Sequence, residues 1–201
     1  SPMSRGLGDV YKRQMPIDGI DADNNGPDIY YKRQTAGEIH PMPEGLRMIA
    51  GAGGATDEQT WEKLQYACEA VNHSGSPEFF KHIPVCEVGD KVLMDIFFPP
   101  CWDGVNLDSE DHKSHMAYPA PEFEGAEEFV CPDTHPVALP EVSYHFKFPV
   151  TEENGGPTGS SRGWKLASDS YNVPDDGDTG GYSLHADWFM AWHPEASALF
   201  T

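Results

Sequence analysis

The groups best suited to do chemistry are histidines and aspartates in the second half of the chain. The set consists of Asp111, His112, His115, His135, His185 and Asp187. His112 and His115 are separated by two residues, and His185 and Asp187 by one, so on a strand the latter two would point to the same face. Imidazole nitrogens and carboxylate oxygens are ligands for zinc and copper, and one short segment can supply two of them.

Three roles for this set stay open. All six residues are candidate ligands of a divalent metal such as zinc or copper. Alternatively His112, His115, His185 and Asp187 are catalytic without a metal, with an imidazole as base and a carboxylate orienting it. In the third case the histidines only brace loops by bonding backbone carbonyls. A metal site requires at least three imidazoles within about 4–5 Å of a common point, whereas braces would be scattered.

The tryptophans add a possible sugar contact. Four of them, Trp102, Trp164, Trp188 and Trp192, lie in the same half of the chain. An exposed indole stacks on the apolar face of a sugar ring, but core packing is the commoner role of any single tryptophan. The sequence contains no H-E-x-x-H motif, which is the usual signature of a zincin.

Short strands are the elements expected to position these groups. Residues 142–148 alternate between apolar and polar side chains, and 92–98 form an apolar run that a Pro-Pro pair ends. Further strands are expected at 46–49, 114–118, 164–167 and 184–188, and one helix at 61–71 from its three- and four-residue apolar spacing. The predicted fold class is therefore mainly β, an antiparallel β-sandwich or jelly-roll-like single domain with long loops and one helix.

Length and charge exclude several classes of protein. The chain has 201 residues, which suits one domain, and a formal net charge of −20, which repels the phosphates of nucleic acids. We therefore expect no nucleic-acid partner. No apolar run reaches the length of a membrane-spanning helix, so no membrane span is expected. The oligomeric state cannot be predicted from these features.

The ends of the chain indicate an artefact at the N-terminus and a truncation at both ends. Residues 1–14 resemble a translated sequencing adapter, and the last residues stop on apolar side chains without a closing signal. We therefore assign 1–14 to an artefact and 15–201 to one domain that is truncated at both ends.

The four cysteines indicate the redox compartment. They contain no C-x-x-C pair, which argues against a zinc ribbon or a thioredoxin-like site. An even number in a loop-rich chain suggests disulfides and an oxidising compartment, and free thiols in a cytosolic protein are the alternative. Of three possible pairings, the sequential pairing Cys68–Cys86 and Cys101–Cys131 closes the moderate loops that we favour.

Four motifs carry a resemblance to a known family. They are GLRMIAG at 45–51, CWDGVNLDSEDHKSHMAYP at 101–119, CPDTHPVALP at 131–140 and GYSLHADWFMAW at 181–192. In this order they resemble DUF1996, a secreted domain of unknown function. The resemblance implies an extracellular protein that is often linked to carbohydrate-binding or cell-wall modules. Family members also carry an N-terminal Ser-His-x-His-type motif, and this chain begins after that point.

Two functions follow as expectations. The first is a secreted enzyme, a hydrolase or an enzyme of another class, that acts on an extracellular or cell-wall polysaccharide through the His/Asp site. The alternative is a non-catalytic carbohydrate-binding or cell-wall structural module. An enzyme needs its clustered histidines to face a cleft, whereas a module would bury each against its own backbone partner.

Overall fold

The chain is mainly β, as predicted. A computed structural model describes residues 27–59, 63–70, 77–121, 128–169 and 180–200. The segment 1–14 lies outside these ranges, so its assignment to an adapter stays a prediction. Five strand pairs in the described residues run antiparallel.

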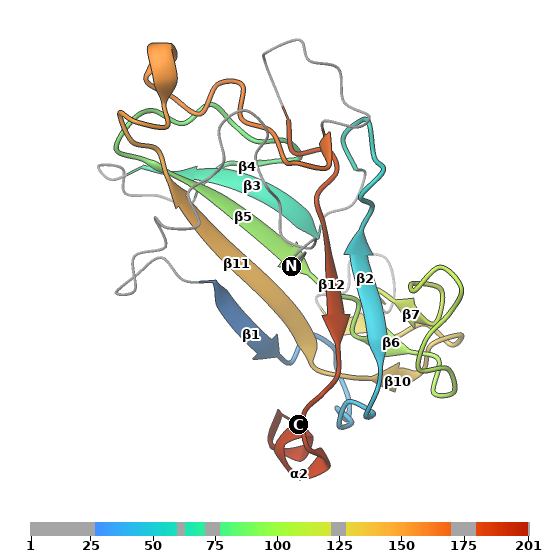
Figure 1. Cartoon of the computed structure of the whole chain (residues 1–201). Coiled ribbons are helices and arrows are strands. Elements are labelled where there is room, and N and C mark those ends of the chain that lie inside the picture. Colours follow the sequence, from blue (N-terminus) through green and yellow to red (C-terminus); the bar gives the residue numbers. More distant parts are fainter. Residues whose placement is uncertain (1–26, 60–62, 71–76, 122–127, 170–179, 201) are drawn as a thin grey trace, which may run out of the picture. The chain divides into compact units, whose positions relative to one another are not determined.

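Most of the regular elements are short strands (Figure 1). They are β1 (Asp28–Lys32), β2 (Arg47–Gly51), β3 (Leu64–Glu69), β4 (Phe79–Phe80), β5 (Lys91–Phe97), β6 (Cys101–Trp102), β7 (Met116–Ala117), β8 (Ala120–Pro121), β9 (Phe129–Val130), β10 (Val137–Ala138), β11 (Glu141–Pro149) and β12 (His185–Phe189). The helical elements are η2 (Gly156–Thr158), α2 (Pro194–Ser197) and η3 (Ala198–Phe200). The five strands expected at 46–49, 92–98, 114–118, 142–148 and 184–188 correspond to β2, β5, β7, β11 and β12, with shifted ends.

The chain divides into two compact units. The first comprises Ser1–Asp28, Gly51–Ile96 and Tyr144–Ala186, and the second comprises Ile29–Ala50, Phe97–Ser143 and Asp187–Thr201. Each unit contains one disulfide. Cys68 bonds to Cys86 in the first unit and Cys101 to Cys131 in the second, so the predicted pairing is confirmed.

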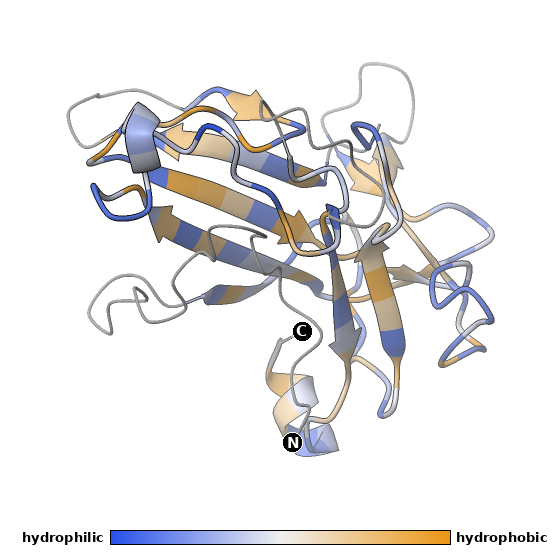
Figure 2. Ribbon diagram, turned by 45° about the horizontal axis from the view of Figure 1, so that its top comes forward, coloured by the Kyte–Doolittle hydropathy of each residue, from blue (hydrophilic) through white to orange (hydrophobic). Residues whose placement is uncertain are grey.

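The largest sheet has the strand order β1-β11-β5-β3-β4. Strand β5 lies between β3 and β11 (Figure 1), and its side chains alternate, with Val92, Met94 and Ile96 buried. Figure 2 shows the same alternation as orange and blue bands along the strands of this sheet. The apolar face of β5 therefore belongs to the core of the first unit, as its period-two pattern requires.

The helix predicted at 61–71 is wrong. Residues 61, 62 and 71 lie outside the described part of the chain, and strand β3 occupies the centre of the segment. This strand pairs with β5 from Leu64 opposite Ile96 to Glu69 opposite Lys91. Ladder hydrogen bonds to a distant strand thus override the helical spacing, a long-range effect that local periodicity does not contain.

The strand predicted at 164–167 is also wrong. Its residues form turns and irregular backbone that lead to Asp169, a fully buried carboxylate. Asp169 accepts hydrogen bonds from the amides of Leu166 (2.8 Å), Gly181 (2.5 Å) and Ser183 (3.0 Å), and from the Ser183 hydroxyl (2.6 Å). One carboxylate therefore joins two loop segments of the first unit, because four donors satisfy its buried charge.

Three small sheets lie wholly or mostly in the second unit. Their strand orders are β10-β6-β7, β12-β2 and β8-β9. Cys101 lies in β6 opposite Ala117 of β7 and Ala138 of β10, so the disulfide to Cys131 is anchored at a central strand. In the described part of the chain no helix has the length and apolar character that crossing a membrane requires.

Candidate functional site

The floor of the site is the exposed face of strands β2 and β12. Met48 and Trp188 are buried, while their neighbours Arg47 and Phe189 project to the surface, as alternation along a strand requires. The two strands continue as a ladder at Leu46, whose carbonyl accepts the amide of Met190 at 2.8 Å. The Arg47 guanidinium lies 5.3 Å from the centre of the Phe189 ring, within the range of a cation–π contact.

A loop at 103–115 covers the other edge of β2. The amide of Arg47 donates to the carbonyl of Leu107 at 2.9 Å, and the amide of Ile49 donates to the carbonyl of His112 at 3.0 Å. The loop is not a strand, but it runs along β2 from Arg47 to Ile49. This backbone pairing places the side chain of His112 beside the floor.

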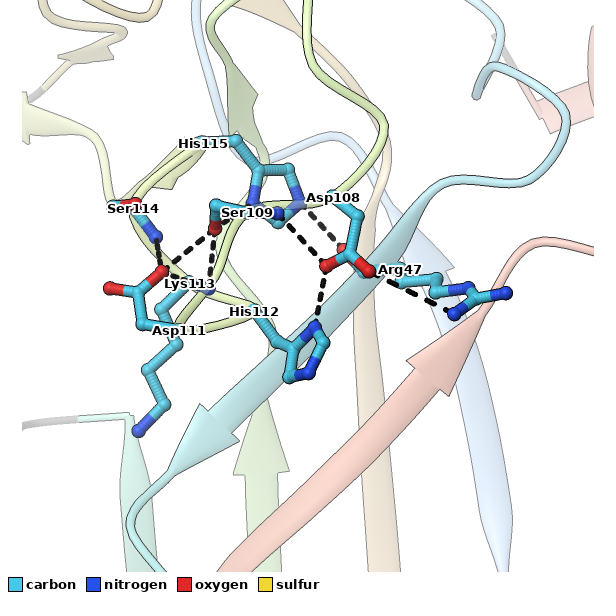
Figure 3. Close-up of polar contacts among 8 residues, drawn as sticks. All are labelled: Arg47, Asp108, Ser109, Asp111, His112, Lys113, Ser114 and His115. Atoms are coloured by element: carbon cyan, nitrogen blue, oxygen red, sulfur yellow. Dashed lines mark hydrogen bonds and ion pairs between the residues drawn. The ribbon is translucent and has the colours of Figure 1, made fainter.

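Asp111 fixes the turn that carries His112. Its Oδ1 accepts hydrogen bonds from the amides of Ser114 (2.8 Å) and Lys113 (3.0 Å) and from the hydroxyl of Ser109 (2.7 Å) (Figure 3). The Ser114 amide, followed by the Ser109 hydroxyl, is the main cause that holds the pKa of Asp111 far below its usual range. Asp111 therefore shapes the loop through hydrogen bonds to its ionised carboxylate.

His115 is a buried brace. Its Nε2 lies 2.6 Å from the carbonyl of Arg47, and its Nδ1 lies 2.7 Å from the hydroxyl of Ser109. Only 2% of the residue is exposed. Because both ring nitrogens are occupied, His115 connects the loop to β2 and has no nitrogen left for a metal or a substrate.

His112 is oriented differently and is exposed. Its Nδ1 lies 2.6 Å from Oδ1 of Asp108, and 48% of its side chain is accessible. Nε2 has no hydrogen-bond partner among the described residues, so it is the nitrogen that remains for chemistry. The hydrogen bond from His112 is the largest cause that lowers the pKa of Asp108, to which the Arg47 guanidinium, 3.8 Å away, also contributes.

The backbone of His112 is also unusual. Its φ is 55°, the one positive value found at a non-glycine residue in the part of the chain that the structure describes. A left-handed conformation costs a residue with a Cβ about 1–2 kcal/mol, and such outliers gather at functional sites. The surrounding hydrogen bonds of Asp111 and Asp108 hold this conformation.

A pocket of about 420 Å³ lies at the junction of loop and floor. It is lined by Arg47, Met48 and Ile49 of β2, by Asp187, Trp188 and Phe189 of β12, and by His112. The pocket thus combines apolar walls with an imidazole, a carboxylate and a guanidinium, the composition usual for small-ligand sites. Of the six predicted site residues it contains two, His112 and Asp187.

The remaining predicted residues have other partners. His135 Nε2 lies 3.1 Å from the carbonyl of Ser114 and Nδ1 lies 2.9 Å from the hydroxyl of Thr134. His185 belongs to the first unit, where its Nδ1 lies 2.9 Å from the carbonyl of Ser183. Among the described residues no group of three or more histidine, cysteine, aspartate or glutamate side chains could hold a metal ion.

Sequence reasoning missed Arg47 and Phe189. Both belong to strands whose apolar neighbours were recognised, and both are exposed by alternation, but their closeness depends on the pairing of β2 with β12. Among the tryptophans, Trp164 and Trp188 are core residues, with 1% and 7% exposed, whereas Trp192 is 46% exposed.

Comparison with known proteins gives a family and no activity. A family model described as a domain of unknown function, DUF1996, matches residues 8–192. The match begins inside the segment 1–14 assigned to an adapter. No curated protein and no solved structure matches the chain.

Proposed function

We propose a function from two premises: the chain belongs to the DUF1996 family, and its pocket unites an oriented imidazole with an exposed aromatic ring. The function is that of a secreted hydrolase that binds an extracellular polysaccharide in this pocket and cleaves it by acid–base catalysis. The observation that carries the proposal is the placement of His112, braced by Asp108, beside Asp187 and Phe189.

The binding part of the proposal rests on Phe189. Its side chain is 55% exposed and forms a wall of the pocket, while the guanidinium of Arg47 contacts the ring. A sugar ring has an apolar face that packs on an aromatic ring, and hydroxyl groups that bond to charged side chains at its edge. Arg47 and Asp187 supply the edge groups. The net charge of −20 favours a neutral chain over a polyanion.

The catalytic part rests on His112. Asp108 holds Nδ1, which fixes the ring and leaves Nε2 to take a proton from water or to give one to a leaving oxygen. Asp187 is the carboxylate of the pocket and would perform the complementary proton transfer, as paired groups do in glycoside hydrolysis. Cleavage of the glycosidic bond needs a proton donor on one side of that bond and a proton acceptor on the other.

The proposal requires no metal. His112 and Asp187 are the two side chains of the pocket that could ligate zinc or copper, while a catalytic zinc needs three protein ligands. His115 and His135 have both ring nitrogens engaged.

Secretion is part of the proposal and is supported by the disulfides. Two disulfides, Cys68–Cys86 and Cys101–Cys131, persist in oxidising compartments and are rare in the cytosol. An extracellular polysaccharide would meet the protein there.

A non-catalytic carbohydrate-binding module is the second candidate. It is favoured by His115, His135 and His185, each of which bonds a backbone carbonyl as a loop brace would. In that case the His112–Asp108 pair would contribute hydrogen bonds to a bound sugar and no proton transfer.

The variant His112→Asn separates the candidates. Asparagine tolerates the left-handed backbone, so the loop is retained while the ring is lost. Substrates are soluble β-glucans and chitin-derived oligosaccharides, with release of reducing ends and the dissociation constant measured in parallel. A hydrolase loses about 100-fold or more in turnover with little change in affinity.

His40→Asn is the matched control, since His40 is exposed, belongs to the same unit and lies outside the pocket. Full turnover in His112→Asn would overturn the catalytic role. Binding without turnover by the unchanged protein would establish the module, and no binding of any saccharide would overturn both candidates.

A further inference from the structure

A second pocket, with a volume of about 300 Å³, lies in the first unit. It is lined by Cys68, Glu78, Phe80, His82, Pro84 and Val85. The Cys68–Cys86 disulfide and the pairing of β4 with β3, which places Phe80 opposite Tyr66, fix the segments that carry these residues. The pocket is therefore built within one unit, from side chains that the proposed function does not use.

The imidazole of His82 is held by a carboxylate and by two aromatic rings. Its Nδ1 lies 2.7 Å from Oε1 of Glu58, and its ring centre lies 5.8 Å from that of Phe80 and 6.5 Å from that of Tyr182. An ionised carboxylate can only accept hydrogen bonds, so the proton between Glu58 and His82 is carried by Nδ1. In the neutral ring Nε2 is then an acceptor, and this is the nitrogen that His82 retains for a ligand.

The other side chains of the lining also favour a cation. Glu78 is exposed and supplies a carboxylate, and no lysine or arginine is among the described residues that line the pocket. Phe80 adds an aromatic ring, whose negative face attracts positive charge. The net charge of −20 raises the local concentration of cations around the chain. The pocket therefore suits a ligand that is positively charged and donates hydrogen bonds.

We propose that this pocket binds a primary ammonium group, carried by an amino sugar or by a lysine side chain. The Glu78 carboxylate pairs with the ammonium group, Nε2 of His82 accepts one of its three N–H donors, and the ring of Phe80 packs against its charge. A metal ion suits the pocket less well, because the described residues contain no group of three or more side chains that could hold one. This inference concerns the first unit and does not depend on the proposed hydrolase.

The experiment compares charged ligands with their neutral, acetylated forms. Glucosamine and the amide of Nα-acetyl-lysine are titrated into the full chain by calorimetry at neutral pH, each beside the form in which the amine is acetylated. The variants are Glu78→Gln, which removes the charge of the carboxylate, and Phe80→Leu, which removes the ring and keeps an apolar side chain. Glu153→Gln is the matched control, because Glu153 is exposed in the same unit and lies outside the pocket.

The expected changes in the dissociation constant differ in size. Acetylation of the amine weakens binding about tenfold or more, because the ion pair and its charged hydrogen bonds are lost. Glu78→Gln weakens the charged ligand about tenfold, and Phe80→Leu weakens it about three- to fivefold, as the loss of an exposed cation–π contact does. Glu153→Gln leaves the dissociation constant within about twofold, because solvent and salt screen a distant charge. Circular dichroism confirms that each variant is folded.

The same titrations separate the two sources of the ammonium group. Tighter binding of glucosamine identifies an amino sugar, tighter binding of the lysine derivative identifies a peptide side chain, and equal affinities identify the ammonium group alone as what is recognised. The inference is overturned if neither charged ligand binds, if the acetylated forms bind as tightly, or if Glu78→Gln leaves the dissociation constant unchanged. None of these results bears on the pocket of His112, so the proposed hydrolase is tested separately.

Discussion

Asp169 in the first unit and Asp111 in the second both hold a loop in place with a carboxylate, but one is buried and the other is exposed to solvent. Each accepts hydrogen bonds from two or more backbone amides and from a serine hydroxyl, and each fixes a loop. Asp169 is completely buried, whereas Asp111 is exposed. The buried carboxylate connects distant segments, while the exposed one shapes a short turn and leaves its neighbour His112 open to solvent. A carboxylate that fixes a loop therefore stabilises the first unit, whereas in the second unit it keeps the side chain of His112 exposed.

The largest expected effect tests the buried brace. Asp169→Ala leaves the amides of Leu166, Gly181 and Ser183 without their acceptor, so the free energy of unfolding should fall by about 4 kcal/mol. Urea unfolding measures it. Asp111→Ala is the matched control, and its loss should be smaller because water replaces the missing acceptor. Equal losses of unfolding free energy in the two variants would contradict the distinction between the buried and the exposed carboxylate.

A smaller effect should separate the two histidines of the loop. His115→Ala removes a buried ring with two hydrogen bonds and should lower the free energy of unfolding by about 2–3 kcal/mol. His112→Asn should change it by less than about 0.5 kcal/mol, because the side chain is half exposed and asparagine accepts the backbone conformation. Thermal unfolding of both variants measures the difference. A larger loss in His112→Asn would show that His112 is structural.

The smallest expected effect is on how the free energy of unfolding falls at acidic pH. The pKa of Asp111 is lowered in the folded chain, chiefly by the Ser114 amide, so its stabilising contribution is complete above the ordinary value of 3.8. The contribution is lost as the pH falls below that value toward the folded pKa, because the unfolded state binds the proton first. Asp111→Asn should therefore flatten the decline of unfolding free energy below about pH 4. An unchanged decline in the variant, measured by urea unfolding at several pH values, would contradict this.

Sequence patterns predicted those features that depend on neighbouring residues. Strands β5 and β11 follow from alternation, and the disulfides follow from the order of the cysteines. The segment of β3 was mistaken for a helix because its pairing with β5 is not encoded locally. The class of the fold was therefore accessible, while the state of one ambiguous segment was not.

The site was predictable in its residue types and not in its arrangement. His112 and His115 look equivalent in sequence, yet His115 is buried because its Nε2 meets the carbonyl of Arg47, a residue far away in the chain. The same long-range contact explains why Arg47 was missed. Residue type predicts what a side chain can do, and the pairing of β2 decides which side chain is exposed to do it.

The loop on β2 has a consequence for self-association. A strand edge with open amides and carbonyls is a template for pairing with another chain, and such edges promote aggregation. The amides of Arg47 and Ile49 on this edge are already bound by the carbonyls of Leu107 and His112. The segment that presents His112 therefore also caps a strand edge, and a shortened loop would leave that edge open to a second copy of the chain.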